Sequence, residues 1–391
     1  MNIEDKINRT VYEMPPSGIR KFFDIVSEMK DAISLGVGEP DFVTPWNIRE
    51  AAIRSLERGK THYTSNWGMT ELRKYISIYL RERFNTAYDP ADIVVTVGAS
   101  EALDLAFRTI LEHGDEVLVP APSYVSYSPG VMFAGGVAVP INTKAENDFR
   151  ITPEDIQKLI TPKTKAIMIP FPNNPTGTVM RRADLEAIAQ VIAKTDMLVI
   201  SDEIYAELTY GDAKHVSMAT IPGMYERTIT INGFSKAFAM TGWRLGYAAG
   251  PSAIINAMVK IHQYSMLCAP IMSQMAGIEA IREALDTNFR QVEEMRKSYD
   301  RRRKLIVGEF NSMGLTCFEP LGAFYVFPCI KSTGMTSEQF CEDLLKKKLV
   351  ATVPGTAFGE AGEGFIRCSY AYSVTAINEA TKRIREYLEE R

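Results

Sequence analysis

The sequence predicts an α/β fold, in which helices flank the mostly parallel sheet of a large domain and a smaller α+β domain follows. Short Val- and Ile-rich segments alternate with amphipathic segments over the first part of the 391-residue chain. This alternation is typical of parallel sheets with helices on both faces. From about residue 280 the pattern changes to a long charged helix and short apolar pieces. Hydrophobic residues make up 46% of the chain and charged residues 24%, which fits an ordinary globular protein.

Five short runs predict buried strands, because each combines β-branched residues with flanking Gly, Pro, Asp or Asn. They are residues 93–97, 116–119, 166–169, 197–200 and 228–231. The segments 100–112 and 182–193 between them predict amphipathic helices. In such sheets ligands bind beyond the carboxyl ends of the strands. The residues that follow each run are therefore the candidates for chemistry.

We expect residues 45–280 to form the large domain. Residues 281–391 are expected to form the small domain, and residues 1–44 an N-terminal arm that packs on it. A helical pattern over 281–310 opens the small domain. Three short apolar pieces follow: 323–327, 349–353 and 365–369.

Composition excludes several functional classes. A net charge of −4 argues against a protein that binds nucleic acid or a membrane surface. Five cysteines without a CxxC pair indicate a reducing, cytoplasmic setting. No stretch reaches the ~18 apolar residues of a membrane span, and the four histidines show no metal-ligand spacing. The basic run 301–304 has acids nearby, so we interpret it as a solvated helix face.

Lys236 follows the last predicted strand, within the run NGFSKAFAMTGWRLGY. A strand end places it in the crevice, where desolvation lowers the pKa of a lysine and frees its amine to attack an aldehyde. Arg244 is within reach of the same pocket and suits a phosphate through paired N–H groups. Taken alone, two surface cations in a loop are the simpler interpretation.

Asp202 follows the fourth predicted strand, and Tyr205 comes three residues later. A carboxylate that is partly buried there needs a donor or a cation as its partner. A pyridinium N–H would be such a partner, and Tyr205 could point its hydroxyl the same way. A helix N-cap is the alternative interpretation of Asp202.

Two further strand ends carry polar groups. After the third strand, the run PFPNNPTG has three prolines and a glycine that fix a rigid turn, in which the amide of Asn174 can face a ligand. After the first strand, Gly98, Ala99 and Ser100 open a helix. Backbone N–H groups and the helix dipole favour an anion at such a start, although an ordinary N-cap looks the same.

In this order the pieces resemble the class I/II aminotransferases, enzymes of fold type I that depend on pyridoxal 5'-phosphate (PLP), over essentially the whole chain. The runs SKAFAMTGWRLGY and NNPTG are the strongest parts. The resemblance implies that Lys236 holds PLP as a Schiff base and that Arg244 binds its phosphate. It also implies that Asp202 pairs with the pyridine nitrogen, and that Tyr205 and Asn174 contact the phenolic oxygen.

The resemblance implies further cofactor contacts. Gly98, Ala99 and Ser100 match the helix start that binds the phosphate, and Tyr124 matches the aromatic residue that stacks on the ring. Tyr63 resembles the tyrosine that reaches the phosphate from the other subunit, which implies a homodimer with shared active sites. Core or loop packing is the simpler interpretation of both tyrosines alone.

On the substrate side, Arg367 matches the arginine that clamps the α-carboxylate, and its fork suits a carboxylate. Gly38 matches a glycine whose backbone meets the same carboxylate; a strand-end salt bridge is the alternative for Arg367. Two departures stand out. Some relatives have a serine that touches the phosphate where this chain has Gly233, and whether Ser235 substitutes is left open. Certain bacterial aspartate aminotransferases have a lysine at the position of Ser100, so aspartate is a less expected donor.

The resemblance implies an aminotransferase that moves an amino group between an L-amino acid and a 2-oxo acid by a ping-pong mechanism. Lys236 would act as general base and acid, beside Asp202 and Tyr205. A PLP-dependent C–S β-lyase shares these cofactor residues and stays an alternative. A ligand-sensing module with this fold is a weaker one, because such regulators carry an N-terminal DNA-binding domain. A nicotinamide-dependent dehydrogenase is excluded because no GxGxxG follows a strand.

The sequence leaves the amino donor open. The arm residues Tyr12, Ile19 and Phe22 favour apolar or aromatic donors if they line the pocket, and packing is the alternative. The arm around 15–19 is expected to close over the substrate and exclude water.

Overall fold

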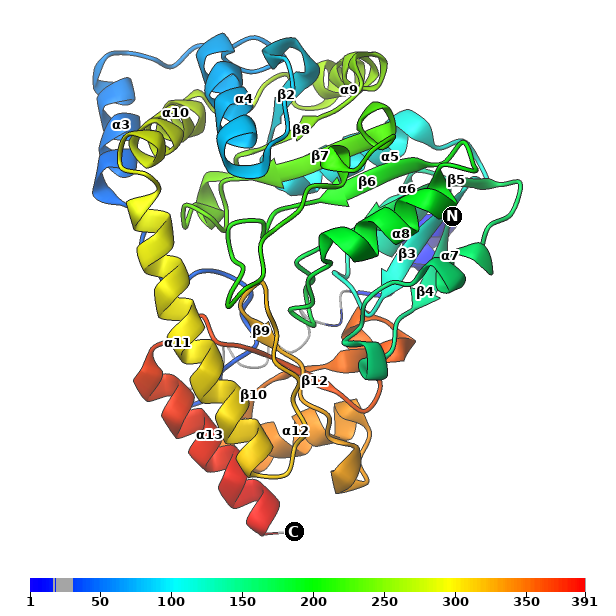
Figure 1. The fold of residues 1–391 in the computed structure, drawn as a ribbon, viewed down its shortest axis with the longest axis vertical. Helices are drawn as coiled ribbons and strands as arrows, with labels where there is room; N and C mark the ends of the chain where they lie inside the picture. Colours follow the sequence, from blue (N-terminus) through cyan, green and yellow to red (C-terminus); the bar gives the residue numbers. More distant parts are fainter. Residues whose placement is uncertain (17, 19–30, 391) are drawn as a thin grey trace.

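The computed structural model describes residues 1–16, 18 and 31–390, and Figure 1 shows their arrangement. Among these residues the α-helices are α1 (Arg9–Glu13), α3 (Trp46–Glu57), α4 (Thr70–Phe84), α5 (Gly98–Ile110), α6 (Tyr127–Phe133), α7 (Pro153–Gln157), α8 (Arg182–Ile192), α9 (Ser252–Ser265), α10 (Ile271–Asp286), α11 (Arg290–Ser312), α12 (Ser337–Lys348) and α13 (Val374–Glu389). The strands are β1 (Ile33–Ser34), β2 (Ile93–Thr96), β3 (Glu116–Ala121), β4 (Val137–Asn142), β5 (Thr164–Ile169), β6 (Leu198–Asp202), β7 (Thr228–Gly233), β8 (Gly246–Ala249), β9 (Tyr325–Val326), β10 (Val350–Ala351), β11 (Val353–Pro354) and β12 (Ile366–Ser369).

The main sheet has seven strands in the order β2-β8-β7-β6-β5-β3-β4. Strands β3 to β7 run parallel, whereas β8 runs antiparallel to both of its neighbours. The prediction of a mostly parallel sheet is confirmed, and all five predicted runs form strands of it. The sequence does not single out β4 and β8. The edge strand β4 is largely exposed and contains Pro140, and β8 is a Gly-Tyr-Ala-Ala run that is poor in β-branched residues.

Helices cover both faces of this sheet, because alternate side chains of each strand point to opposite faces. In β5, Ala166 and Met168 pack in a core with α5, α6 and α9, whereas Ile167 and Ile169 pack with α7 and α8. At the β2 end, α3, α4 and α10 cover the second face. We call the main sheet with these helices the main body. None of the helices within the described residues combines the length and apolar character needed to cross a membrane.

The small-sheet region consists of β1, β9 to β12, α12 and α13, and lies below the main body in Figure 1. Strands β11, β12 and β9 form an antiparallel sheet, and β1 pairs in parallel with β10, with Ile33 opposite Val350. Helix α11 extends from the main body along this region and packs on α13. Segments from both ends of the described chain therefore share one small unit.

The predicted single helix over 281–310 is wrong. Helix α10 ends at Asp286 and α11 begins at Arg290. Between them Asn288 and Phe289 adopt left-handed backbone conformations, with φ of 51° and 60°. An α-helix of L-residues cannot continue through such residues. The apolar side chain of Phe289 is buried at the break, so the hydrophobic pattern gives no sign of it.

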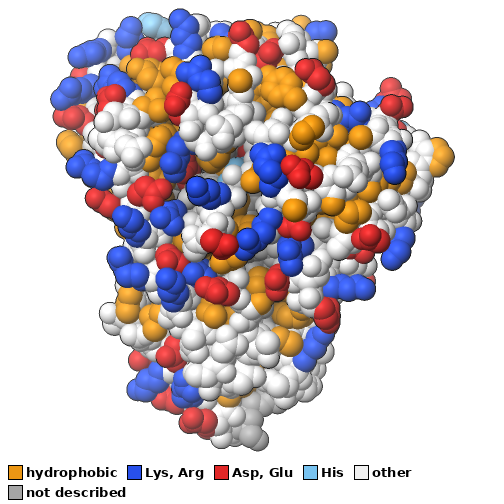
Figure 2. Space-filling model, in the orientation of Figure 1, with side chains coloured by type: hydrophobic (Ala, Val, Ile, Leu, Met, Phe, Trp, Pro, Cys, Tyr) orange, Lys and Arg blue, Asp and Glu red, His pale blue; other side chains and the backbone are white. Residues whose placement is uncertain are grey.

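The interpretation of the basic run 301–304 as a solvated face is wrong for Arg303, which is only 1% exposed. Its guanidinium forms ion pairs with Asp300 at 2.7 Å and Glu319 at 2.6 Å, and lies over the ring of Tyr210. A buried charge is tolerated when it is paired in this way. On the face shown in Figure 2, basic and acidic side chains are interspersed.

Candidate active site

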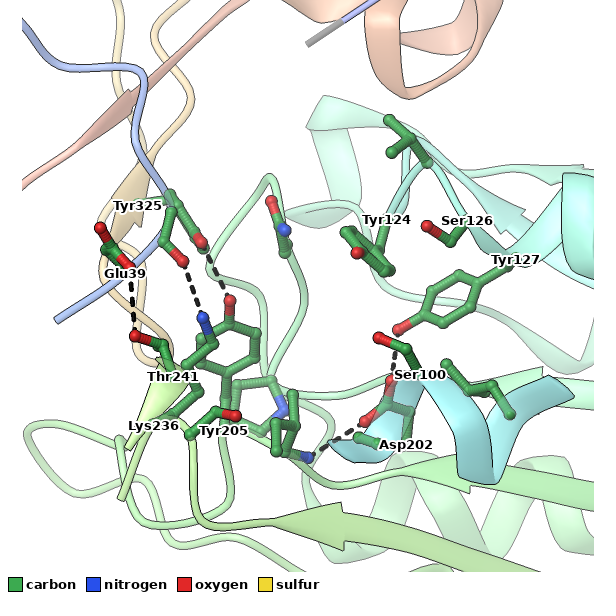
Figure 3. Close-up of a pocket in the computed structure, with 18 of the residues that line it drawn as sticks. Glu39, Ser100, Tyr124, Ser126, Tyr127, Asp202, Tyr205, Lys236, Thr241 and Tyr325 are labelled. Atoms are coloured by element: carbon green, nitrogen blue, oxygen red, sulfur yellow. Dashed lines mark hydrogen bonds between the residues drawn. The ribbon is translucent and has the colours of Figure 1, made fainter. Parts of the chain in front are cut away.

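A cavity of about 510 Å³ is lined by residues from the carboxyl ends of main-sheet strands and from the small-sheet region. Figure 3 shows side chains from both sides pointing into it. It gathers the candidate site residues other than Gly98 and Tyr63. The candidate residues that line the cavity are Gly38, Ala99, Ser100, Tyr124, Asn174, Asp202, Tyr205, Ser235, Lys236, Arg244 and Arg367. The position agrees with the rule that ligands bind where parallel strands end.

Lys236 lies three residues beyond the end of β7. Its Nζ donates a hydrogen bond to the carbonyl oxygen of Gly38 at 2.7 Å. Burial lowers the pKa of Lys236 to about 8; Glu39 opposes this shift, whereas Arg367 and Arg244 reinforce it. A lysine with such a pKa carries some free amine near neutral pH, which can act as a nucleophile or a base.

Asp202 is the last residue of β6 and is 4% exposed. Its Oδ2 accepts a hydrogen bond from Tyr127 Oη at 2.9 Å, and its Oδ1 accepts one from the backbone N–H of Ile204 at 3.2 Å. Burial raises the pKa of Asp202 to about 6, against the effect of these two hydrogen bonds. Turns rather than a helix follow β6, so Asp202 is not a helix N-cap. The desolvated carboxylate suits a cationic N–H partner.

Tyr205 lies next to Lys236, whose Nζ is 5.7 Å from the centroid of the tyrosine ring. Its Oη is 2.9 Å from Tyr325 Oη (Figure 3). Burial raises the pKa of Tyr205 well above its ordinary value. The hydroxyl therefore stays protonated and can donate a hydrogen bond to a ligand oxygen.

Arg367, in β12, is 2% exposed and forms no salt bridge with any acid in the described part of the chain. The alternative of a strand-end salt bridge is therefore wrong. Its guanidinium donates to Asn174 Oδ1 at 3.0 Å and to the carbonyl oxygen of Gly36. It lies 4.6 Å from the ring centroid of Tyr325 and 4.9 Å from that of Phe358. A buried guanidinium without an acid leaves a positive charge for a ligand carboxylate.

The start of α5 lies against the guanidinium of Arg244. Gly98 has a φ of 78°, and a Cβ on it would lie 2.7 Å from Arg244 Nη2, so only glycine fits. Arg244 Nη1 donates to the carbonyl oxygen of Thr241 at 2.9 Å. Ala99 and Ser100 continue the first turn and line the cavity. A helix start beside a guanidinium fork is the arrangement that binds phosphate in proteins.

Ser235 is buried and lines the cavity, whereas Gly233 does not. A Cβ on Gly233 would lie 3.0 Å from the carbonyl oxygen of Leu245 and 3.1 Å from Gly246 Cα. Gly233 thus allows close packing of β7 on its neighbour. The hydroxyl that this stretch presents to the cavity belongs to Ser235.

The two tyrosines inferred by resemblance lie in different places. Tyr124 lines the cavity, and its ring meets that of Tyr127 edge to face, with centroids 5.6 Å apart. Tyr63 is 82% exposed and does not line the cavity of its own chain. A role for Tyr63 at this kind of site therefore requires a second subunit.

The arm contributes Gly38 and Glu39 to the cavity lining within the described residues. Tyr12 lies in α1, is 57% exposed and does not line the cavity. Ile19 and Phe22 lie outside the described residues, as does Ser17 of the segment 15–19. The expectation that these residues shape the donor pocket stays a prediction.

The lining residues that were not expected from the sequence include Glu39, Tyr127, Thr241 and Tyr325. Thr241 Oγ1 donates to Glu39 Oε2 at 3.1 Å, and both lie beside Lys236 in Figure 3. Tyr127 could have been suspected, because it follows Tyr124 by three residues at the start of α6. Tyr325 carries no such signal, since its neighbours Phe324 and Phe327 make the segment look like ordinary core.

Comparison with known proteins agrees with this geometry. Residues 30–384 match the family described as aminotransferase class I and II. The putative aminotransferase YugH of Bacillus subtilis (strain 168) is 54% identical over 379 residues, which cover 97% of each chain. The aspartate aminotransferase of Pyrococcus abyssi is 50% identical over 96% of each chain.

Among solved structures, the aromatic aminotransferase from Pyrococcus horikoshii OT3 superimposes with a TM-score of 0.90 at 47% identity. The match covers 95% of this chain and 99% of that one. Sequence and fold therefore agree over nearly the full length, including the elements that carry Asp202, Lys236 and Arg367. The chain belongs to the class I and II aminotransferase family, and it is an aminotransferase.

Proposed function

We propose that this aminotransferase uses PLP to move an amino group from an L-amino acid to a 2-oxo acid in two half-reactions. One observation carries the proposal. Lys236, with its pKa lowered to about 8, stands near the buried carboxylate of Asp202 and shares one cavity with two arginines. These arginines, Arg244 and Arg367, have no acidic partner among the described residues.

The cavity fits PLP group by group. The Gly98 and Arg244 contact offers a helix start and a guanidinium to a phosphate. Asp202 offers a desolvated carboxylate to a ring N–H, and Lys236 offers an amine to an aldehyde. Asn174, Tyr205 and Tyr124 provide polar groups and a ring on the remaining sides. A volume of about 510 Å³ lies within the range of small-molecule sites.

When bound, PLP supplies an electron sink for the negative charge that develops at the substrate Cα. The amine of Lys236 would then take the proton that leaves Cα and return it at the cofactor carbon that carried the aldehyde, across the nitrogen from Cα. Asp202 keeps the ring nitrogen protonated. Arg367 orients the substrate through its α-carboxylate, which fixes the Cα–H bond relative to Lys236.

We further propose that uncharged apolar or aromatic amino acids are preferred over aspartate as donors. The cations that line the cavity within the described residues are Lys236, Arg244 and Arg367. Each already has a proposed task, so a second substrate carboxylate finds no further cation there. Ser100, with a hydroxyl in place of a charge, lies on the same wall. One similar protein is named for aspartate and another for aromatic substrates, so the donor needs a direct test.

A homodimer with shared sites is also part of the proposal. Tyr63 is exposed, and its loop is joined to the segment 264–267 by a hydrogen bond from Asn66 Nδ2 to the Leu267 carbonyl oxygen at 2.8 Å. Tyr264, in that segment, is 89% exposed. Exposed apolar side chains that gather in this way are typical of subunit interfaces. Light scattering should give twice the 43.7 kDa chain mass, and a monomer would contradict the shared site.

For the domains we propose a PLP-binding unit over 45–280, and a second unit of 1–44 with 281–391. Two hydrophobic cores around the main sheet lie wholly within 45–280, which supports the division. The core around α12 and α13 also takes in Tyr205 and Tyr210, so the two units pack directly on each other. The small-molecule partners would be the amino acid and the 2-oxo acid. The cytoplasmic location stays a prediction.

Spectroscopy and product analysis test the cofactor and the reaction together. Purified protein should take up PLP, show visible absorbance, and after borohydride reduction carry the cofactor on the peptide that contains Lys236. Adding each amino acid of a panel should bleach the band, and a 2-oxo acid should restore it. Failure to take up PLP would refute the cofactor assignment. Release of pyruvate and ammonia from cystathionine without a 2-oxo acid would favour the lyase alternative.

A further inference from the structure

Tyr325 lines the cavity from the small-sheet region, and no motif in the sequence points to it. It lies in β9 and is 1% exposed. The guanidinium of Arg367 lies over its ring at 4.6 Å, and its Oη lies 2.9 Å from Tyr205 Oη. One side chain therefore contacts both the arginine proposed to bind substrate and the tyrosine proposed to contact the cofactor.

The hydroxyl of Tyr325 also packs on the backbone that holds the lysine. A Cβ on Gly38 would lie 2.6 Å from Tyr325 Oη, so this close approach requires glycine. The carbonyl oxygen of Gly38 accepts the hydrogen bond from Lys236 Nζ at 2.7 Å. The position of the Tyr325 ring thus constrains the carbonyl oxygen of Gly38, which accepts the hydrogen bond from Lys236.

The pair of hydroxyls has two protons but one mutual hydrogen bond, so one proton remains for another acceptor. Tyr325 Oη is enclosed between Tyr205 and Gly38, and Figure 3 shows it directed at Tyr205. If Tyr325 donates, the proton of Tyr205 is free to point into the cavity. A hydroxyl that accepts one hydrogen bond donates a stronger one.

We propose that Tyr325 is a positioning residue of the transamination: its hydroxyl donates to Tyr205, and its ring supports Arg367. Tyr205 is then oriented to donate to the phenolic oxygen of bound PLP, and Arg367 is held to receive the substrate α-carboxylate. This inference rests on the proposed function. It assigns two separable tasks to one side chain, the cofactor task to the hydroxyl and the substrate task to the ring.

Tyr325→Phe tests the hydroxyl alone, because it leaves the ring under Arg367. A hydrogen-bond donor at the phenolic oxygen stabilises the negative charge on that oxygen. It therefore weakens the attraction between that oxygen and the proton on the lysine nitrogen. Loss of the support for this donor should raise the pH midpoint of the visible absorbance of the holoenzyme by about half a pH unit. The KM for the amino acid should stay within about twofold.

Tyr325→Leu tests the ring as well. It should show the same midpoint shift and, in addition, raise the KM for the amino acid by about tenfold, because Arg367 loses its aromatic support. Tyr210→Phe is the matched control. Tyr210 is equally buried and donates to the carbonyl oxygen of Ala323, but it does not line the cavity. Neither the midpoint nor the KM should change in this variant.

A double variant tests whether the hydroxyl acts through Tyr205. In a Tyr205→Phe background, Tyr325→Phe should no longer move the midpoint. A shift that persists there, or a Tyr325→Phe enzyme that titrates like the wild type, would overturn the inference. If the wild-type protein takes up no PLP, the proposed function fails, and the positioning role of Tyr325 fails with it. If the wild type titrates normally and only Tyr325→Phe has no effect, the proposed function stands and the positioning role is lost.

Discussion

The two walls of the cavity are built in different ways. On the wall formed by the main body, Asp202 ends β6 and Lys236 follows β7, and these two strands pair in parallel. On the opposite wall, Gly38, Tyr325 and Arg367 come from segments far apart in the chain. The strands that carry Tyr325 and Arg367 are short: β9 has two residues and β12 has four.

This difference determines how each wall keeps its geometry. Backbone hydrogen bonds of the main sheet hold the carboxylate and the amine relative to each other. On the opposite wall, the short strands β9 and β12 also pair. Side-chain contacts that cross the cavity add to this pairing, from Arg367 to Asn174 and from Tyr325 to Tyr205. Changes on the main-body wall should therefore affect the chemical step. Changes on the opposite wall should affect substrate affinity first.

Lys236→Ala should have the largest effect. Removing the proposed base should lower kcat by about four orders of magnitude, the upper end of what proton transfer by a side chain contributes. Stopped-flow absorbance with a saturating amino acid would measure this. Lys331→Ala is the control, because Lys331 also lies over a ring, that of Phe365, but outside the cavity. Substantial turnover in Lys236→Ala would mean that another group moves the proton.

Asp202→Asn should have the next largest effect. We expect kcat to fall by about 100- to 1000-fold, as for loss of a preorganised charge at a reacting group. PLP should also bind more weakly, which equilibrium dialysis would show. The amide is similar in size and can still accept from Tyr127, so the fold should be kept. An unchanged rate would remove Asp202 from the ring nitrogen. Asp212→Asn, which alters an exposed ion pair with Arg181, should have no effect.

Arg367→Ala should distinguish the roles of the two walls. We expect the KM for the amino acid to rise about 100-fold, because a buried charge partner of the carboxylate is lost. The PLP dissociation constant should change little. Arg367→Lys should recover only part of the affinity, since an ammonium cannot form the paired contact of a guanidinium. If PLP binding weakened as much as substrate binding, the walls would not act separately.

The pH dependence of PLP uptake should show a smaller effect. Only the neutral amine of Lys236 attacks an aldehyde, and its pKa is lowered to about 8. The uptake rate of the apoenzyme should therefore rise about tenfold per pH unit below pH 8 and level off above it. An ordinary lysine would level off only above pH 10. Because Arg367 is one cause of the lowered pKa, Arg367→Ala should move the break upward, a link between the walls that stopped-flow traces would detect.

Much of the main body could be predicted from the sequence, because buried parallel strands are continuous β-branched runs between breakers. Strand β8 lacks this composition, because it is rich in small residues. Strand β4 has Val and Ile but is an exposed edge that contains Pro140. The break between α10 and α11 was missed because Phe289 continues the apolar pattern while its backbone is left-handed. Burial of Arg303 depends on Glu319, sixteen residues away, which no local pattern reveals.

The candidate site divides in the same way. The positions of Asp202 and Lys236 follow from the rule that chemistry lies beyond strand ends. Arg367 and Gly38 were inferred only through family resemblance, because nothing local marks a residue on a short strand as part of a site. The contact between Tyr205 and Tyr325 joins residues 120 positions apart. Such contacts depend on how two sheets face each other, which sequence periodicity does not specify.

The pairing of β1 with β10 also affects how the protein is made. A ribosome completes every strand of the main sheet well before it reaches β10, so β1 waits without its partner through most of synthesis. The wall that carries Arg367 can form only after that pairing partner has emerged. Long-range pairings of this kind close late in folding. A growing chain would therefore gain the strand that precedes Lys236 early and the arginine proposed to bind amino acids last.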